Sequence, residues 1–367
     1  MRGPAVFPIM IAAGGTGGHF FPAEALAGEL LARGRRVALM TDTRSGGLQS
    51  PVFAGLDRYV ISGAGIAGRG WRAGSAMLSL ARGVAEARRI LVRSNAAAVV
   101  GFGGYPCVAP VLATRLMRRR PPVVLHEQNA VLGRANRFLA QHADILALSF
   151  AATARVPETA ATVLTGNPVR PTVRSVPYMP PGDVLRVLVL GGSLGARVFS
   201  DVVPPALVAL PHELRSRLSV VQQCRAEDLA RVRAAYAAAE ISAELSAFFP
   251  DVAERLAAAH LVIARAGAST VAELAVAGRP AILVPLPGAI DDHQSANARA
   301  LEQARGASVI AQREFTPDAL CGRLAALLAS PDMLSHAALA AGSIARANAT
   351  TRLADLVEQL MRQEVPA

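Results

Sequence analysis

The sequence contains no lysine, few cysteines and few aromatic residues, and each shortage excludes a class of protein. All 38 basic residues among the 367 are arginines, and a P-loop, which needs a lysine, is therefore excluded. The three cysteines, Cys107, Cys224 and Cys321, are too far apart for metal-ligand spacing, which favours reduced thiols in a cytoplasmic protein. Aromatic residues make up 4% of the chain, too few to interleave with the basic clusters as nucleic-acid binding requires.

Long apolar runs are also missing. The longest charge-free span, residues 94–114, is interrupted by glycines and prolines. A membrane-spanning helix needs about 20 continuous apolar residues, so we expect no transmembrane segment. The apolar stretch Val6–Ala13 continues directly into a glycine loop, which indicates a first β-strand rather than a signal peptide.

Positive charge is in excess, but only in one half of the chain. Residues 1–165 contain 19 arginines against 8 acidic residues, a net charge of +11, whereas residues 166–367 contain 19 of each. A basic half favours an anionic partner, such as nucleic acid, an acidic membrane face or a phosphorylated substrate. A genome composition that favours arginine explains the missing lysine, but it does not explain this asymmetry.

Short apolar runs alternate with helical stretches, which is typical of parallel sheets with crossover helices. Strands are expected at 6–13, 36–40, 97–100, 123–126, 145–147, 162–164, 186–190, 218–222, 261–264 and 281–284. Five prolines in residues 166–183 indicate a linker. We therefore expect Rossmann-like domains at 1–165 and 185–348, a linker at 166–184, and a C-terminal helix at 349–367 that packs back on the first domain.

Four glycine-bearing turns follow expected strands, at 14–18, 101–104, 191–195 and 265–270. None fits the nicotinamide fingerprint, because Phe20 stands where a glycine is required. The first turn precedes a helix and carries His19, so it is a candidate anion site with a group that exchanges protons near neutral pH. The last turn places Ser269 and Thr270 at a helix N-terminus, where hydroxyls and free N–H groups can hold a diphosphate.

Three polar groups follow other strands. Glu273 is spaced either for a capping box with Thr270 or for gripping vicinal ribose hydroxyls, and spacing leaves both open. The amide-rich segment 291–297 suits sugar hydroxyls, and we expect no metal there because further ligands are not indicated. His126, Glu127 and Asn129 are expected to form a cluster at an open site rather than in the core.

A basic helix is expected at residues 75–93, with Met77, Ala81 and Val84 facing the core. A second basic cluster follows at 115–120. Apolar residues among arginines suit peripheral membrane attachment, and a solvated basic face explains them equally well. The candidate membrane residues are Trp71, Arg72, Leu78, Arg82, Met117 and Arg118.

Seven motifs then stand together in order: GGTGGHFFP (14–22), GFGGYP (101–106), LHEQNAVLGRAN (125–136), TGNPVR (165–170), GGSLGAR (191–197), ARAGASTVAEL (264–274) and DDHQSANA (291–298). As a set they closely resemble the MurG family of peptidoglycan glycosyltransferases over nearly the whole chain. The resemblance implies an α/β fold of the GT-B type, with two Rossmann-like doubly wound domains facing each other across a cleft. It also implies inverting transfer of GlcNAc from UDP-GlcNAc to the C4 hydroxyl of MurNAc in undecaprenyl-diphosphate-linked lipid I, which gives lipid II.

The resemblance further implies a setting and partners. These are UDP-GlcNAc, lipid I, an anionic membrane surface and other cell-wall and division proteins, with no nucleic acid and no obligatory cofactor. The protein would be peripheral on the cytoplasmic face of the inner membrane and would serve cell-wall synthesis, cell shape and division. Another GT-B enzyme, such as a glycolipid glycosyltransferase or a UDP-GlcNAc 2-epimerase, is the alternative.

Residue roles follow from the matched motifs. His19 is implied as the general base, with Glu127 as the alternative. At Phe249 the backbone would meet uracil, although an aliphatic side chain is common at that position. The other implied donor contacts are Thr16, Gly17, Gly18, Asn129, Arg170, Ser193, Gly267, Ala268, Ser269, Thr270, Glu273, His293, Gln294 and Asn297. The implied acceptor contacts are Gly104, Tyr105, His126 and Glu127.

Overall fold

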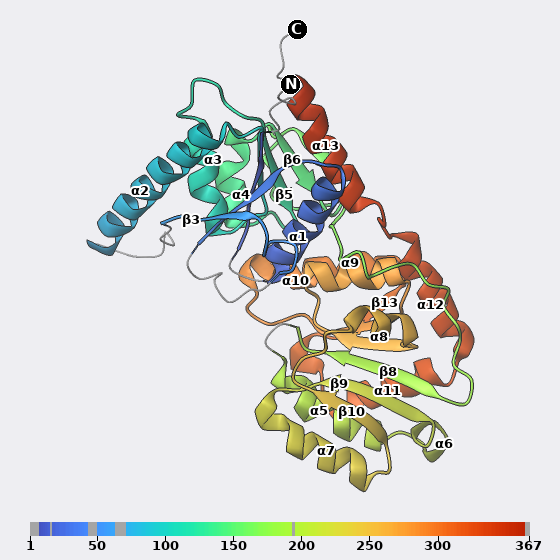
Figure 1. The fold of residues 1–367 in the computed structure, drawn as a ribbon. Helices are drawn as coiled ribbons and strands as arrows, with labels where there is room; N and C mark the ends of the chain where they lie inside the picture. The colour runs from blue at the N-terminus through green and yellow to red at the C-terminus, as the bar shows by residue number, and fades with distance from the viewer. Residues whose placement is uncertain (1–6, 15–16, 43–49, 63–70, 193–194, 364–367) are drawn as a thin grey trace. The chain divides into compact units, whose positions relative to one another are not determined.

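The computed structural model describes residues 7–14, 17–42, 50–62, 71–192 and 195–363, with only the backbone of 71–75. The chain divides into two compact units (Figure 1). Unit 1 comprises Met1–Arg170 and Asn348–Ala367, and unit 2 comprises Pro171–Ala347. The boundary between the units therefore falls inside the proline-rich segment 166–184.

Unit 1 is built on a seven-stranded parallel sheet of order β3-β2-β1-β4-β5-β6-β7. Its strands are β1 (Ile9–Ala12), β2 (Val37–Thr41), β3 (Asp57–Val60), β4 (Ala98–Gly101), β5 (Val123–Glu127), β6 (Ile145–Leu148) and β7 (Thr162–Leu164). Its helices are α1 (Gly17–Ala32), α2 (Trp71–Ser94), α3 (Val108–Thr114), α4 (Arg134–Leu139) and α13 (Ala349–Gln363), with short 3₁₀ turns at η2 (Tyr105–Cys107) and η3 (Ala140–His142).

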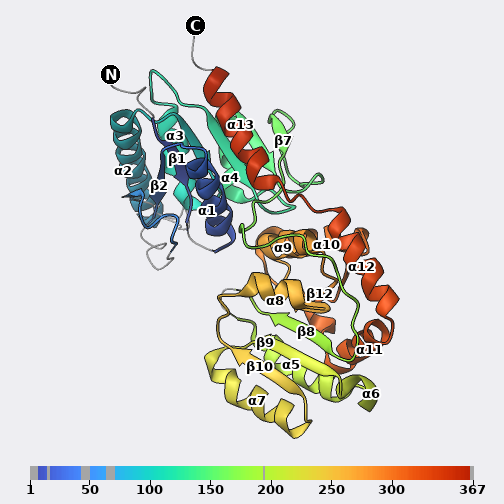
Figure 2. The ribbon, with the colours of Figure 1, turned by 45° about the vertical axis from the view of Figure 1, so that its right-hand side comes forward.

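Helices cover both faces of this sheet (Figure 2). Side chains of α1 and α13 pack with one face, and side chains of α2, α3 and α4 pack with the other. Arg33, the residue after α1, also pairs with Asp355 at 2.6 Å and Glu358 at 3.0 Å on α13. The last helix of the chain is therefore part of the first unit.

Unit 2 has a six-stranded parallel sheet of order β10-β9-β8-β11-β12-β13. Its strands are β8 (Leu185–Leu190), β9 (Leu218–Gln223), β10 (Ser242–Ser246), β11 (Leu261–Ala264), β12 (Ala281–Leu283) and β13 (Ala307–Val309). Its helices are α5 (Arg197–Val208), α6 (His212–Arg215), α7 (Leu229–Ala238), α8 (Val252–Ala258), α9 (Ala268–Ala277), α10 (His293–Gln303), α11 (Pro317–Leu328) and α12 (Pro331–Ser343), with 3₁₀ turns η4 (Ala226–Asp228), η5 (Ile290–Asp292) and η6 (Gln312–Glu314).

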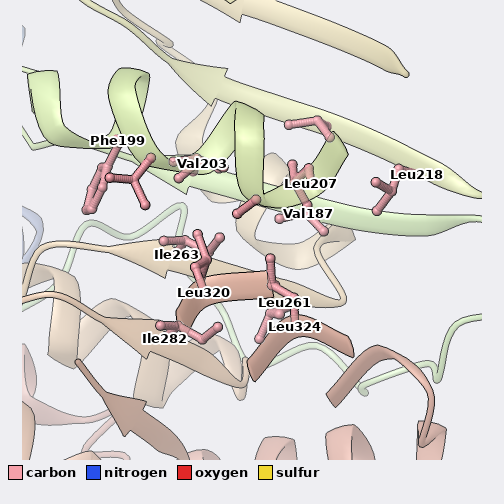
Figure 3. Close-up of a cluster of buried hydrophobic side chains, with 14 of the residues drawn as sticks. Val187, Phe199, Val203, Leu207, Leu218, Leu261, Ile263, Ile282, Leu320 and Leu324 are labelled. Atoms are coloured by element: carbon pink, nitrogen blue, oxygen red, sulfur yellow. The ribbon is translucent and has the colours of Figure 1, made fainter. Parts of the chain in front are cut away.

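The core of unit 2 lies where α5 and α11 meet the sheet (Figure 3). Phe199, Val203 and Leu207 recur at intervals of four residues along α5, so they share one face of that helix. They pack into one buried cluster with strand residues such as Ile263 and with Leu320 of α11. This apolar face fixes α5 over the strands whose carboxyl ends carry the functional loops.

The ten strands expected from apolar runs are all present, whereas β3, β10 and β13 were not expected. All three are edge strands, and none of their residues is buried. An edge strand covered on few sides needs no continuous apolar run, so hydropathy predicted one edge strand, β7, and missed the other three.

The core face of α2 differs from the prediction. Met77 is 70% exposed, and the buried positions are Ala76, Gly83, Ala87 and Leu91. A Cβ atom at Gly83 would collide with the carbonyl oxygen of Ser62. At Gly83, α2 therefore comes closer to the segment after β3 than a side chain would allow. Val84 packs against the core as predicted, whereas Met77 and Ala81 are exposed.

Among the described residues, no single helix is long and apolar enough to cross a membrane. The pair α11 and α12 meets the length and composition criteria together, but the two helices are bent by 95°. Leu320, Leu324 and Leu334 of this pair belong to the buried core of unit 2.

Candidate active site

His19 lies at the start of the first helix, as the third residue of α1. Its half-buried ring lies against two glycines of the turn after β4. A Cβ atom at Gly103 would be 3.4 Å from His19 Cε1, and one at Gly104 would be 3.7 Å from His19 Nε2. Both glycines have positive φ angles, 83° and 69°, a conformation that glycine adopts without strain. The glycine motifs 14–18 and 101–104 therefore meet in unit 1, although Thr16 lies outside the described residues.

His19 is hydrogen-bonded to Gln128, a residue that sequence reasoning did not single out. His19 Nδ1 lies 2.9 Å from Gln128 Oε1. Gln128 Nε2 donates to Phe102 O at 3.0 Å and lies 3.1 Å from His126 Nδ1. Gln128 is 1% exposed, so this contact connects the half-buried ring of His19 to the buried end of β5.

His126 does not line an open site, contrary to expectation. It is 0% exposed, because β5 is an interior strand covered on both faces, and its Nε2 lies 3.0 Å from Gly166 O. Burial lowers the pKa of His126 to about 4, so the ring is neutral at pH 7. A direct contact with the acceptor is therefore not available to this side chain.

Glu127 is also buried, at 2% exposure, and both of its oxygens accept hydrogen bonds. Oε1 accepts from Asn129 N at 3.0 Å and Asn129 Nδ2 at 3.1 Å. Oε2 accepts from Gly133 N and from Asn136 Nδ2, each at 2.9 Å. A carboxylate committed to four donors holds the turn after β5, which favours His19 over Glu127 as a base.

The remaining unit 1 candidates are more accessible. Asn129 and Arg170 are half-buried, and Arg170 Cζ lies 5.5 Å from the centre of the Phe21 ring. Tyr105 is 42% exposed at the start of η2. Gly17 and Gly18 are the first two residues of α1, where helix N–H groups lack intrahelical partners.

In unit 2 the loop after β11 leads into α9, as expected. Gly267 is the N-cap residue, and Ala268, Ser269 and Thr270 form the first turn. Glu273 is the sixth residue of the helix, so the capping-box alternative is excluded. Ser269 Oγ is buried with no hydrogen-bond partner in the described part of the chain. The first-turn N–H groups and this hydroxyl suit an anionic ligand.

Two side chains stabilise the loop between β11 and α9. Asn297, expected to read sugar hydroxyls, is 0% exposed and donates to Ala266 O at 3.1 Å. Arg265, which the sequence did not single out, donates to Val284 O at 3.0 Å and to Gln312 Oε1 at 2.7 Å. Both side chains therefore position the loop, because they hold it against neighbouring segments.

The polar segment 291–297 begins with two residues in the left-handed region, Asp291 (φ 56°) and Asp292 (φ 52°). Gln294 Oε1 accepts from Leu286 N at 3.0 Å, and His293 Nδ1 lies 2.8 Å from Ile290 O. Both side chains are half-buried and sit in the first turn of α10. Among the described residues, no group of three or more His, Cys, Asp or Glu side chains is placed to hold a metal ion.

Two further donor candidates lie beside β8 and β10. Ser193 lies outside the described residues, but Gly191 before it donates to Gln223 Oε1 at 3.1 Å. Phe249 is 4% exposed, and Arg255 Cζ lies 4.2 Å from the centre of its ring. The Phe249 side chain is thus packed away, and only its backbone is suited to meet a base.

The basic surface of unit 1 lies on α2 and the turn after α3. Leu78 is 54% exposed, and Arg82 and Arg118 are exposed, whereas the side chains of Trp71 and Arg72 are not described. Met117 is packed against the core, so its expected exposure is wrong.

Leu116 is the exposed apolar residue of that turn, at 59%. Its carbonyl oxygen accepts from Arg88 Nε at 3.0 Å, which joins the turn to α2.

Comparison with known proteins identifies the family. Residues 9–147 match the glycosyltransferase family 28 N-terminal domain, and residues 186–360 match its C-terminal domain. A protein of Granulibacter bethesdensis is 62% identical over 98% of this chain and 95% of its own length. It is named UDP-N-acetylglucosamine–N-acetylmuramyl-(pentapeptide) pyrophosphoryl-undecaprenol N-acetylglucosamine transferase. A relative of that name from Acidiphilium cryptum is 53% identical, with both chains fully covered.

The crystal structure of Acinetobacter baumannii MurG is also similar, with a TM-score of 0.79, 32% identity, and coverage of 96% of this chain and 99% of that one. The chain belongs to the MurG family of glycosyltransferases. The expected GT-B fold of this family is confirmed. The structure shows three supporting residues that the sequence did not predict: Gln128, Asn136 and Arg265. The first two lie in the motif 125–136 and the third in 264–274, but their spacing gave no sign of a role in the site.

Proposed function

We propose that this member of the MurG family transfers GlcNAc, with inversion, from UDP-GlcNAc to the C4 hydroxyl of MurNAc in lipid I. The observation that carries the proposal is 62% identity over 98% of the chain to a relative named for this transfer. Both relatives are named as transferases, which favours transfer over epimerisation.

The proposed transfer assigns proton removal to His19 and stabilisation of the leaving group to α9. His19 takes the proton of the C4 hydroxyl as that oxygen attacks C1 of GlcNAc from the face opposite UDP. The bond between C1 and the UDP oxygen breaks, and UDP leaves with the electron pair. The N-terminus of α9 stabilises the charge on the departing diphosphate, in place of an obligatory metal ion. The donor contacts of Gly17, Asn129 and Arg170 stay predictions.

A transfer assay tests the proposal directly. Radiolabelled UDP-GlcNAc is incubated with a lipid I analogue, and the labelled disaccharide product is quantified with and without the acceptor. Acceptor-dependent product is expected. Failure to form the disaccharide would reject the assigned transfer, and epimerisation of UDP-GlcNAc without acceptor would indicate the alternative enzyme.

Glu273 is proposed to bind the ribose hydroxyls of the donor. The variant Glu273→Gln keeps the shape of the side chain but removes its charge, which weakens its hydrogen bonds to hydroxyls. We expect the KM for UDP-GlcNAc to rise roughly tenfold, with kcat little changed. Initial-rate kinetics measure both, with the exposed Glu302→Gln on α10 as the matched control. An unchanged donor KM in Glu273→Gln would argue against the ribose contact.

We also propose that the basic surface of unit 1 attaches the protein to an anionic membrane on the cytoplasmic side. Each arginine near such a surface contributes about 1 kcal/mol, and exposed apolar residues such as Leu78 add burial in the interface. Contacts with other cell-wall and division proteins stay a prediction.

The double variant Arg82→Glu/Arg118→Glu is therefore expected to bind anionic vesicles at least about tenfold more weakly. Vesicle co-sedimentation measures this. The control Arg233→Glu/Arg323→Glu makes the same charge change at exposed sites of unit 2 and should have a smaller effect. Equal loss in both variants would mean that net charge, rather than this surface, determines binding.

A further inference from the structure

We propose that Gln128 is a positioning residue that fixes which ring nitrogen of His19 carries the hydrogen. The inference rests on the proposed function, in which His19 accepts the proton of the acceptor hydroxyl. If it holds, Nδ1 of His19 is always the N–H group, and Nε2 is the atom that accepts the proton.

The orientation of the Gln128 amide follows from its surroundings. The end assigned as Nε2 lies 3.0 Å from Phe102 O and 3.2 Å from His126 O. Backbone carbonyl oxygens only accept hydrogen bonds. A flipped amide would place its oxygen against both carbonyl oxygens and leave a buried repulsive contact. The amide nitrogen therefore has to face β5 and the Phe102 carbonyl.

His126 strengthens this assignment. Its Nε2 lies 3.0 Å from Gly166 O, another group that only accepts, so Nε2 carries the hydrogen of the ring. A fully buried ring stays neutral and has one N–H. Its Nδ1 is then a lone-pair acceptor, 3.1 Å from the Gln128 amide nitrogen. All three neighbours of Gln128 Nε2 are acceptors.

The consequence for His19 is direct. With its nitrogen committed to these acceptors, Gln128 presents Oε1 to His19 Nδ1 at 2.9 Å. An amide oxygen only accepts, so Nδ1 has to be the N–H of neutral His19, and Nε2 keeps its lone pair. Histidine free in water prefers the opposite arrangement, with hydrogen on Nε2. The hydrogen bonds from Gly166 O through His126 and Gln128 to His19 thus reverse the intrinsic tautomer preference of the His19 ring.

The neighbouring acid does not take this role. Glu127 has its oxygens engaged by Asn129, Gly133 and Asn136. In serine proteases a carboxylate orients the histidine and also stabilises its charged form. Here the neutral amide of Gln128 orients the His19 ring without a charge. A substitution of Gln128 therefore removes the orientation without removing an ionic partner of His19.

Nitrogen NMR tests the proposal. Wild-type protein labelled with ¹⁵N-histidine is measured at a pH where the rings are neutral, and His19→Gln identifies the His19 signals among the seven histidines. We expect a protonated Nδ1 and an unprotonated Nε2 for His19. In Gln128→Met, a substitution of similar length, the Nε2–H form should become the major one. Because the wild-type measurement stands by itself, it remains decisive if the variant fails to fold.

Kinetics supply the second readout. Gln128→Met is expected to lower kcat on the order of 100-fold, while the KM for UDP-GlcNAc stays within about twofold. The matched control is Gln222→Met in unit 2, which removes another fully buried glutamine whose Nε2 donates to Phe199 O. This control should leave the His19 signals unchanged.

Three results would overturn the positioning role. These are an Nε2–H form of His19 in the wild-type protein, an unchanged tautomer in Gln128→Met, and a changed tautomer with an unchanged kcat. Failure of the proposed function is distinguishable. It appears as absence of disaccharide product in the wild-type assay, and the NMR result does not depend on that assay.

Discussion

Replacing His19 by alanine is expected to lower kcat for GlcNAc transfer by about 10²–10⁴-fold, the usual contribution of a general base. The reason is geometric as well as chemical. The ring lies against Gly103 and Gly104 and is tied to Gln128, so its orientation is set before substrate binds. The neighbouring imidazole among the described residues, His126, is buried, whereas the ring of His19 is partly exposed.

Steady-state kinetics at saturating lipid I analogue measure the effect. The KM for UDP-GlcNAc should change little, because the proposed diphosphate and ribose contacts lie on α9 of unit 2. His336→Ala, an exposed histidine of α12, controls for the loss of an imidazole. A kcat for His19→Ala equal to that of the wild type would rule out the assigned base.

Replacing Arg279 by leucine is expected to destabilise unit 2 by about 3–5 kcal/mol. Arg279 is 1% exposed, and within the described part of the chain its guanidinium donates to five backbone carbonyl oxygens. The acceptors are Leu256 O (2.9 Å), Ala257 O (2.6 Å), Ala277 O (2.7 Å), Gly278 O (3.1 Å) and Val176 O (3.1 Å). They belong to the C-terminal ends of α8 and α9, to the residue that caps α9, and to the segment of unit 2 that precedes β8. Leucine would remove the side-chain donor from all five carbonyl oxygens, of which Leu256 O keeps the backbone N–H of Ala259. Local relaxation offsets this cost only in part.

Denaturant-induced unfolding, followed for the two units as separate transitions where they resolve, measures the change. Arg279→Lys should fall between wild type and leucine, because it keeps the charge but loses the branched set of donors. Arg323→Leu, at an exposed position of α11, is the matched control and should change stability by less than about 0.5 kcal/mol. A loss below about 1 kcal/mol in Arg279→Leu would show that the carbonyl groups find other donors.

The strands could be predicted from the sequence where a buried strand consists of a continuous run of apolar residues. Interior strands such as β4 and β11 are buried along their whole length, and each appears as an apolar run. The edge strands β3, β10 and β13 carry no buried residues, and the hydropathy of the sequence did not predict them. Met77 was misassigned to the core face of α2 because hydropathy ranks it above Gly83, whereas the close approach to Ser62 requires glycine.

The site could be predicted in part, for a related reason. Glycine turns and polar residues at strand ends pointed to His19 and to the start of α9, because the carboxyl ends of parallel strands share one edge of a sheet. Their contacts with substrate stay predictions. His126, Glu127 and Asn297 were expected to meet substrate, yet all three are buried and hold other groups in place. Composition and spacing do not distinguish a side chain that touches a ligand from one that supports it.

By itself the sequence determined the family, the two parallel α/β units and the strand ends at which chemistry is placed, because apolar runs and ordered glycine motifs are local properties of the chain. Only the tertiary structure decided how those residues are used. Gln128 and His19 are 109 positions apart in sequence, and their hydrogen bond exists because β5 and the start of α1 meet at one end of a sheet. Burial and hydrogen-bond partners depend on segments far apart in the chain, so they are set by packing rather than by any local pattern.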